Sequence, residues 1–231
     1  AIVPAHGAIL FLFLQSFSQA NLSMWDILGR IIGMGLFCGA FGINVGHELG
    51  HRVKPFEQFL AKSLLLTSLY MHFFIEHNKG HHKHVATPQD PSSAFYKQTL
   101  YAFWVQTFLG TQREAWKIAI NEARKKSRKW PLFLNEMALF QAIQLTFLSI
   151  ILFVFGGNIM FFFIASAMIG AGLLETVNYI EHYGIERKLL PDGKYEKVNP
   201  THSWNTNHII SNFLLFQLQR HSDHHMTASK P

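Results

Sequence analysis

The sequence predicts an all-α protein, a polytopic transmembrane helical bundle with a histidine-rich di-metal site at the helix ends. Of its 231 residues 49% are hydrophobic and only 15% are charged. The charged residues fall in a few blocks between long apolar runs, and clusters of histidine stand where those runs end. Such segregation of charge is typical of an integral membrane protein.

Four apolar runs approach the roughly 20 residues that cross a hydrocarbon core about 30 Å thick. They cover residues 1–20, 25–46, 137–155 and 158–180. Turn-forming residues at 21–24 and 156–158 would join them as two hairpins. A fifth run, 56–75, begins just after one histidine cluster and ends at the next. If it crossed the membrane, it would put these clusters on opposite faces, so we expect an interfacial or re-entrant helix.

Two polar segments, 83–135 and 183–231, are expected outside the membrane. Residues 111–129 have the pattern of a basic amphipathic helix, and Pro191-Asp192-Gly193 is typical of a hairpin turn. The two transmembrane hairpins place every histidine cluster on one side, together with every lysine and arginine except Arg30. By the positive-inside tendency, that side is the cytoplasm.

Nine histidines make up the clusters at the ends of the apolar runs. They are His47, His51, His77, His81, His82, His182, His221, His224 and His225. Neutral imidazole is a common metal ligand, and packing alone gives no reason to gather imidazoles at the mouth of a bilayer. Nine are too many for one ion. His77 and His81, four residues apart, would project from one face of a helix, and the single cysteine, Cys38, excludes a site built on a thiolate pair.

Two other functions fit part of this pattern. The stretch 47–51 matches the helix motif of zinc proteases, with Glu48 as general base. A protease would leave most of the clustered histidines unexplained, because it needs only one ligand besides the two in the motif. A metal transporter would need ligands near the bilayer midplane on broken helices. His6 and His72 are expected as packed polar residues, and His84, His202 and His208 are left outside the ligand set.

Acidic residues beside the histidines could orient them, because a metal-bound imidazole usually donates its second N–H to a carboxylate or carbonyl. The candidates adjacent in sequence are Glu48, Glu76, Glu181 and Asp223. Glu175 and Asn178 precede His182 by seven and four residues, roughly on its helix face. Glu175 is therefore either an orienting group or a strut to a neighbouring helix.

These motifs resemble those of the membrane-bound alkane 1-monooxygenases (alkane omega-hydroxylases), within the histidine-rich membrane di-iron enzymes. The matching stretches are HELGHR at 47–52, EHNKGHHKHVATPQDPSSA at 76–94, NYIEHYGIER at 178–187, THSWNTNHIISN at 201–212 and LQRHSDHH at 218–225. The resemblance implies that the nine histidines bind two non-haem irons and that O₂ hydroxylates a medium-chain n-alkane at its terminal carbon. It implies electrons from NADH through rubredoxin reductase and rubredoxin, which is either fused or separate. A related hydroxylase or desaturase acting on a fatty acyl or alkyl-aromatic substrate is the alternative.

Basic residues near the histidines are candidate docking charges for rubredoxin, which is typically acidic. They are Lys79, Lys83, Arg113, Lys117 and Arg220. Positive-inside retention and contact with lipid headgroups explain them equally well. No nucleic-acid partner is expected, because most basic residues flank apolar runs. We expect 1–231 to be a single membrane-embedded catalytic domain of a longer chain, in a bacterial inner membrane with its metal site facing the cytoplasm.

Overall fold

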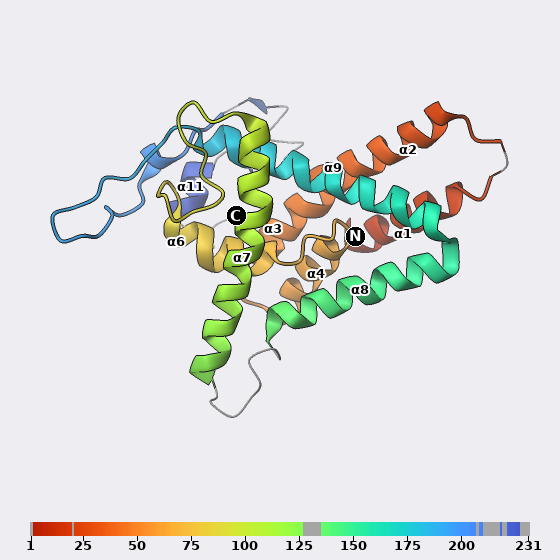
Figure 1. The fold of residues 1–231 in the computed structure, drawn as a ribbon, viewed down its shortest axis with the longest axis horizontal. Helices are drawn as coiled ribbons and strands as arrows, with labels where there is room; N and C mark the ends of the chain where they lie inside the picture. The colour runs from red at the N-terminus through yellow and green to blue at the C-terminus, as the bar shows by residue number, and fades with distance from the viewer. Residues whose placement is uncertain are drawn as a thin grey trace. The chain divides into compact units, whose positions relative to one another are not determined.

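The computed structural model describes residues 2–19, 21–126, 135–206, 208–209, 218 and 221–226 (Figure 1). Within these residues the secondary structure is helical, apart from an isolated β-bridge between Leu189 and Tyr195. The all-α prediction is confirmed. Two compact units divide the chain: a first unit of residues 1–71 and 129–173, and a second unit of residues 72–128 and 174–231.

The first unit contains most of the apolar helices. They are α1 (Ile2–Ser16), α2 (Met24–Phe37), the π-helix η1 (Cys38–Ile43), α3 (Asn44–Gly50), α4 (Pro55–Leu66), α8 (Glu136–Phe155) and the first two thirds of α9 (Gly157–His182). Ser23 begins α2 with a capping box to Asp26, and Asn135 caps α8. Gly156, with a φ of 93°, turns the chain between α8 and α9 as the sequence predicts.

In the part of the chain that the structure describes, three helical stretches are long and apolar enough to cross a membrane: Met24–Gly50, Glu136–Phe155 and Gly157–His182. They correspond to three of the four expected spans. The remaining span, expected over 1–20, is the 15-residue apolar helix α1, which is shorter than the sequence suggests. Whether α1 crosses the bilayer stays a prediction.

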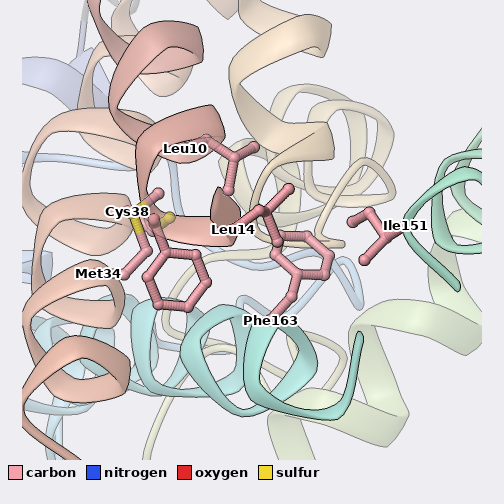
Figure 2. Close-up of a cluster of buried hydrophobic side chains, with 7 residues drawn as sticks. Leu10, Leu14, Met34, Cys38, Ile151 and Phe163 are labelled. Atoms are coloured by element: carbon pink, nitrogen blue, oxygen red, sulfur yellow. The ribbon is translucent and has the colours of Figure 1, made fainter. Parts of the chain in front are cut away.

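Small residues bring the α2–η1 helix and α9 into backbone contact in the first unit. A Cβ placed on Gly35 would lie 2.6 Å from the Cβ of Ile169, and one on Gly170 would lie 3.0 Å from the Cβ of Cys38. Glycines at such crossings allow the close approach that packs membrane helices. Beside this crossing, Figure 2 shows the apolar core of the unit, to which α1, α2, η1, α8 and α9 contribute. Its buried members are Leu10, Phe13, Leu14, Met34, Cys38, Ile151 and Phe163.

The apolar run 56–75 is divided in the structure. Helix α4 ends at Leu66, Leu69 adopts a positive φ of 51°, and the next helix begins at Phe73. A helix of 12 residues is about 18 Å long, too short for a hydrocarbon core of about 30 Å. The exposed faces of Phe56 and Phe59 on α4 fit the expected interfacial position, which stays a prediction.

The second unit carries the polar segments and most of the histidines. Its helices are α5 (Phe73–Glu76), the π-helix η2 (His77–His81), α6 (His82–His84), α7 (Leu100–Lys126), the end of α9, the 3₁₀ turn η3 (Pro200–His202) and α11 (His221–Met226). Helix α7 begins 11 residues before the expected basic helix and packs against α5 and η2. The predicted hairpin turn forms around Gly193, where the Leu190 N–H donates to the Lys194 carbonyl over 2.7 Å.

Candidate metal centre

Four histidines of the second unit form one compact group, which we call the first histidine set: His81, His182, His221 and His225. The set draws on three separate segments, η2, the last residue of α9 and the short helix α11. Candidate ligand atoms of all four lie within 4.8 Å of one another. The Nε2 of His221 is 3.1 Å from that of His182 and 2.8 Å from that of His225.

The remaining histidines of the second unit's clusters form a second histidine set: His77, His82 and His224. The Nε2 of His82 lies 3.2 Å from the Nε2 of His77 and 3.2 Å from that of His224. The rings of His77 and His81 stack with their centres 5.2 Å apart, as expected for side chains that project from one face, yet the two residues belong to different sets. The segment His77–His81 is a π-helix, in which positions five apart come together, so His77 meets His82 while His81 belongs to the first set.

Ring nitrogens at these separations fit ligands of a common ion. Two nitrogens, each about 2.0–2.1 Å from one metal, are separated by about 3 Å. The Nε2 of His81 is buried and has no hydrogen-bond partner among the described residues. An unpartnered imidazole nitrogen in a buried group of four is costly without a ligand. The first set therefore fits a bound metal ion.

The first unit contains an imidazole pair of its own, at the end of α3. His47 is buried and His51 is half-buried, and their Nε2 atoms are 3.2 Å apart. The predicted carboxylate Glu48 lies 3.3 Å from the Nδ1 of His47. The pair thus has the nitrogen spacing seen in the two sets of the second unit.

Asp90 orients His81, a role that the sequence analysis missed. Its Oδ2 lies 2.9 Å from the Nδ1 of His81 and accepts a hydrogen bond from the Ser93 hydroxyl, while Oδ1 accepts one from the backbone N–H of Ser92. Burial acts to raise the pKa of Asp90, but the adjacent imidazole and these hydrogen bonds outweigh it and lower that pKa. The signal in the sequence was an acidic residue that lies nine positions after His81, between two prolines, with two serines following the second proline.

The carboxylates predicted from adjacency take different places. Glu181 lies beside His221, with its Oε2 3.5 Å from the Nδ1 of that ring. Glu76 is buried, and its Oε1 has no hydrogen-bond partner among the described residues. Burial, with Asp90, Glu175 and Glu114 nearby, raises the pKa of Glu76 well above its ordinary value. The side chain of Asp223 lies outside the described residues.

Glu175 joins α9 to α7. Its Oε2 accepts hydrogen bonds from the Thr107 hydroxyl at 2.6 Å and from the Nδ2 of Asn178 at 3.2 Å. Glu175, Thr107 and Asn178 are all buried. Through its bond to Thr107, Glu175 links α9 to a neighbouring helix, which is one of the two roles that the sequence allowed for it.

Histidines outside the nine have ordinary polar partners. The Nε2 of His6 lies 2.9 Å from the Thr67 hydroxyl oxygen, and the Nε2 of His72 lies 3.3 Å from the Thr111 hydroxyl oxygen. In His202, Nδ1 accepts from the Asn199 N–H and Nε2 lies 3.2 Å from Glu196. His208 is exposed and His84 is half-buried.

Two of the candidate docking lysines are already ion-paired. Lys79 lies 2.8 Å from Glu122, and Lys117 lies 3.1 Å from Glu114. Lys83 and Arg113 are exposed, and Arg220 lies outside the described residues. Exposed ion pairs contribute little to stability, so the pairing does not preclude a role in docking.

The sequence matches the family model described as "Fatty acid desaturase" over residues 24–231. It is 39% identical to the alkane 1-monooxygenase of Pseudomonas putida over 96% of this chain and 55% of that protein. It is 40% identical to alkane 1-monooxygenase 1 of Alcanivorax borkumensis, again over 96% of this chain and 55% of the relative. Identity to the xylene/toluene monooxygenase hydroxylase component of Pseudomonas putida is 27%, over 87% of this chain and 53% of that protein. The chain spans about half the length of the curated relatives it matches. Because the family model covers most of the sequence, the chain belongs to the fatty acid desaturase family.

Proposed function

We propose that this chain is the catalytic core of an alkane 1-monooxygenase, which hydroxylates the terminal carbon of a medium-chain n-alkane with O₂. The observation that carries the proposal is the presence of two separate histidine sets in one unit, one of four imidazoles and one of three. Relatives at about 40% identity named alkane 1-monooxygenase support the same activity.

The nine histidines would hold two non-haem irons. The first histidine set would bind one iron, and the second histidine set would supply ligands to the other. When bound, the iron pair supplies the redox chemistry that activates O₂. Zinc has no redox chemistry, so a zinc pair would not serve this reaction.

The carboxylates of the chain would fix which nitrogen each imidazole presents. Asp90 lies at the Nδ1 of His81, Glu181 at the Nδ1 of His221 and Glu48 at the Nδ1 of His47. The hydrogen bond between Asp90 and the Nδ1 of His81 leaves the Nε2 lone pair of that ring for the metal and holds the ring in place. An alkane offers no polar group, so only the shape of an apolar cavity could select its terminal carbon.

Electrons would come from NADH through rubredoxin reductase and rubredoxin, at a site on the cytoplasmic face of a bacterial inner membrane. The excess of basic residues on the histidine side supports this orientation and an acidic partner. Identity to the xylene/toluene monooxygenase component favours hydroxylation of an alkyl-aromatic substrate as the second candidate.

Metal content and product analysis test the proposal. We expect about two irons per chain in protein purified in detergent, and conversion of octane to 1-octanol with rubredoxin, rubredoxin reductase, NADH and O₂. His182→Ala should lose iron, whereas His208→Ala, a change at an exposed histidine, should retain it. Toluene oxidised in preference to octane would favour the second candidate. One zinc per chain, with peptide cleavage that depends on Glu48, would reject both and support a protease.

A further inference from the structure

The proposed reaction needs an external source of electrons. Hydroxylation converts RH, O₂, two electrons and two protons into ROH and H₂O. Biological iron–sulfur carriers are held by several cysteine ligands, and this sequence has one cysteine, Cys38, which is buried. The proposed function takes these electrons from a separate carrier protein or domain, which would deliver them through a surface near a ligand of the iron pair.

One exposed aromatic surface of the second unit is connected to the first histidine set. We call it the aromatic patch, and it consists of Tyr96, Lys97, Tyr183 and Trp204. Tyr96 is 70% exposed and Trp204 is 59% exposed. The rings of Tyr96 and Tyr183 lie 6.3 Å apart, and the Lys97 Nζ lies 5.6 Å from the centre of the Tyr96 ring. Tyr183 is half-buried, and its hydroxyl accepts a hydrogen bond from the Lys97 N–H over 3.0 Å while its carbonyl accepts one from the Trp204 indole, so Tyr183 contacts each of the other three residues.

Trp204 holds the residues on both sides of His182. Its backbone N–H donates to the carbonyl of Glu181 over 2.8 Å, and its indole N–H donates to the carbonyl of Tyr183 over 3.0 Å. His182 is fully buried in the first histidine set. Two hydrogen bonds therefore join Trp204, whose indole is exposed, to the residues on both sides of a proposed iron ligand.

We propose that the aromatic patch is the docking surface for an acidic one-electron carrier protein, and that electrons reach the first histidine set through Trp204 and the 181–183 backbone. The inference rests on the proposed function. In each encounter the carrier is oxidised by one electron and the iron pair is reduced by one, so two encounters supply one hydroxylation. Such a partner must leave between electrons, and weak redox complexes bury small interfaces.

The charge of the surrounding chain fits an acidic partner. Residues 94–97 and 183–206 contain five basic and three acidic side chains. Glu196 is occupied by His202 and the Lys188 N–H, and the Arg187 guanidinium by the carbonyls of Lys83 and Glu196. The exposed charged side chains are four lysines and two acids, and this positive excess would steer an acidic protein toward the patch.

Exposed tyrosine and tryptophan also suit the membrane–water interface. Residues 183–206, which include Trp204, expose charged side chains of both signs. This favours a surface in water over one at the membrane. Those exposed charged residues are Glu186, Lys188, Asp192, Lys194 and Lys197. A lipid-facing segment would favour basic residues alone.

The test compares two reductants on the iron-loaded protein in detergent, where no bilayer is present. Rapid mixing with reduced rubredoxin measures reduction by an acidic carrier, and mixing with dithionite measures reduction that needs no docking. We expect Lys97→Glu and Tyr96→Ala each to lower the rubredoxin rate by about tenfold at low salt. The dithionite rate and the iron content should not change. Trp204→Phe should lower the rubredoxin rate as well, because it removes the indole N–H.

Lys54→Glu is the control, since it reverses an exposed charge of the first unit that belongs neither to the patch nor to the candidate docking residues. Unchanged rubredoxin rates in the patch variants would overturn the proposal, and so would a defect only in Lys54→Glu. A defect confined to protein in nanodiscs would assign the patch to lipid and also overturn it. A wild-type protein without iron would instead reject the proposed function, and so would one that forms no octanol when it is reduced with dithionite, freed of the excess reductant and then mixed with octane and O₂.

Discussion

The Nε2 atoms of His77 and His82 lie 3.2 Å apart, although the two residues are five positions apart in the chain. An α-helix brings positions three and four apart to one face. The π-helix His77–His81 instead brings positions five apart together. The wider turn leaves His81 free to join His182, His221 and His225, so one short helical segment supplies both histidine sets.

This division of His81 and His82 can be tested by counting metal. We expect His81→Ala and His82→Ala each to lower the iron content from about two toward one per chain. The double variant should approach zero, because each substitution removes a ligand from a different ion. A double variant that keeps one iron would show that both residues bind the same ion. His84→Ala, in the same segment but outside both sets, should keep about two irons.

Asp90→Asn should weaken metal binding without unfolding the protein. The substitution keeps the shape of the side chain but removes the charge that faces the Nδ1 of His81 at 2.9 Å. Loss of such an orienting group typically costs about 10–100-fold in metal affinity, measurable by competition with a chelator. Asp192→Asn, in an exposed turn, is the control and should bind as the wild type does. An affinity unchanged in Asp90→Asn would remove this residue from the site.

Much of this arrangement was predictable because its signals are local. Apolar runs and turn residues indicated α8, the Gly156 turn and α9. The spacing of histidines identified His81, His182, His221 and His225 as candidates for metal binding, and the structure brings these four together. Each of these features depends on residue types close together in the sequence.

Other features depend on three-dimensional contacts or on backbone geometry. The π-helix at His77–His81 was not predicted, because a two-residue pattern of histidines fits an α-helix equally well. Asp90 reaches His81 only because the turn at residues 87–93 folds back on η2. The break after Leu66 was missed because the apolar run continues through it, while the chain itself turns at Leu69.

Gly35→Ala should destabilise the first unit. The new Cβ would lie 2.6 Å from the Cβ of Ile169 and 2.9 Å from the carbonyl oxygen of Ser166, and neither atom belongs to a flexible side-chain end. Overpacking of this kind costs about 1–3 kcal/mol, which should lower the midpoint of thermal unfolding by several degrees. Gly33→Ala is the matched control on the same helix, because a Cβ there meets nothing within 4 Å. Equal midpoints for the two variants would contradict the close crossing of α2 and α9.

Thr107→Val should destabilise the protein more than Thr107→Ser. The Thr107 hydroxyl donates to Glu175 over 2.6 Å, and both side chains are fully buried. Valine has nearly the same shape but leaves the carboxylate without this donor, which costs about 1–3 kcal/mol or more for a charged group. Serine keeps the hydroxyl and loses one methyl group. Thermal unfolding of the two variants in detergent makes the comparison, and a larger loss in the serine variant would indicate that Thr107 acts through packing alone.

His72 should make the protein less stable in mild acid. Burial lowers the pKa of His72 from 6.5 to about 4. Between these values the unfolded chain binds a proton at this histidine and the folded chain does not. The free energy of unfolding therefore falls as the pH decreases from about 6.5 to about 4, by at most about 1.4 kcal/mol per pH unit.

His72→Gln should remove this contribution, because glutamine has no titration in the range and can still hydrogen-bond to Thr111. Thermal unfolding midpoints at pH 7.5 and pH 5 give the comparison. We expect the midpoint to fall less between these pH values in His72→Gln than in the wild type. The other histidines are common to both proteins, so their titration cancels in the difference. His208→Gln changes an exposed histidine and should leave the wild-type pH dependence intact. If His72→Gln and the wild type lose stability in parallel, His72 is protonated in the folded protein and its burial does not suppress the charge.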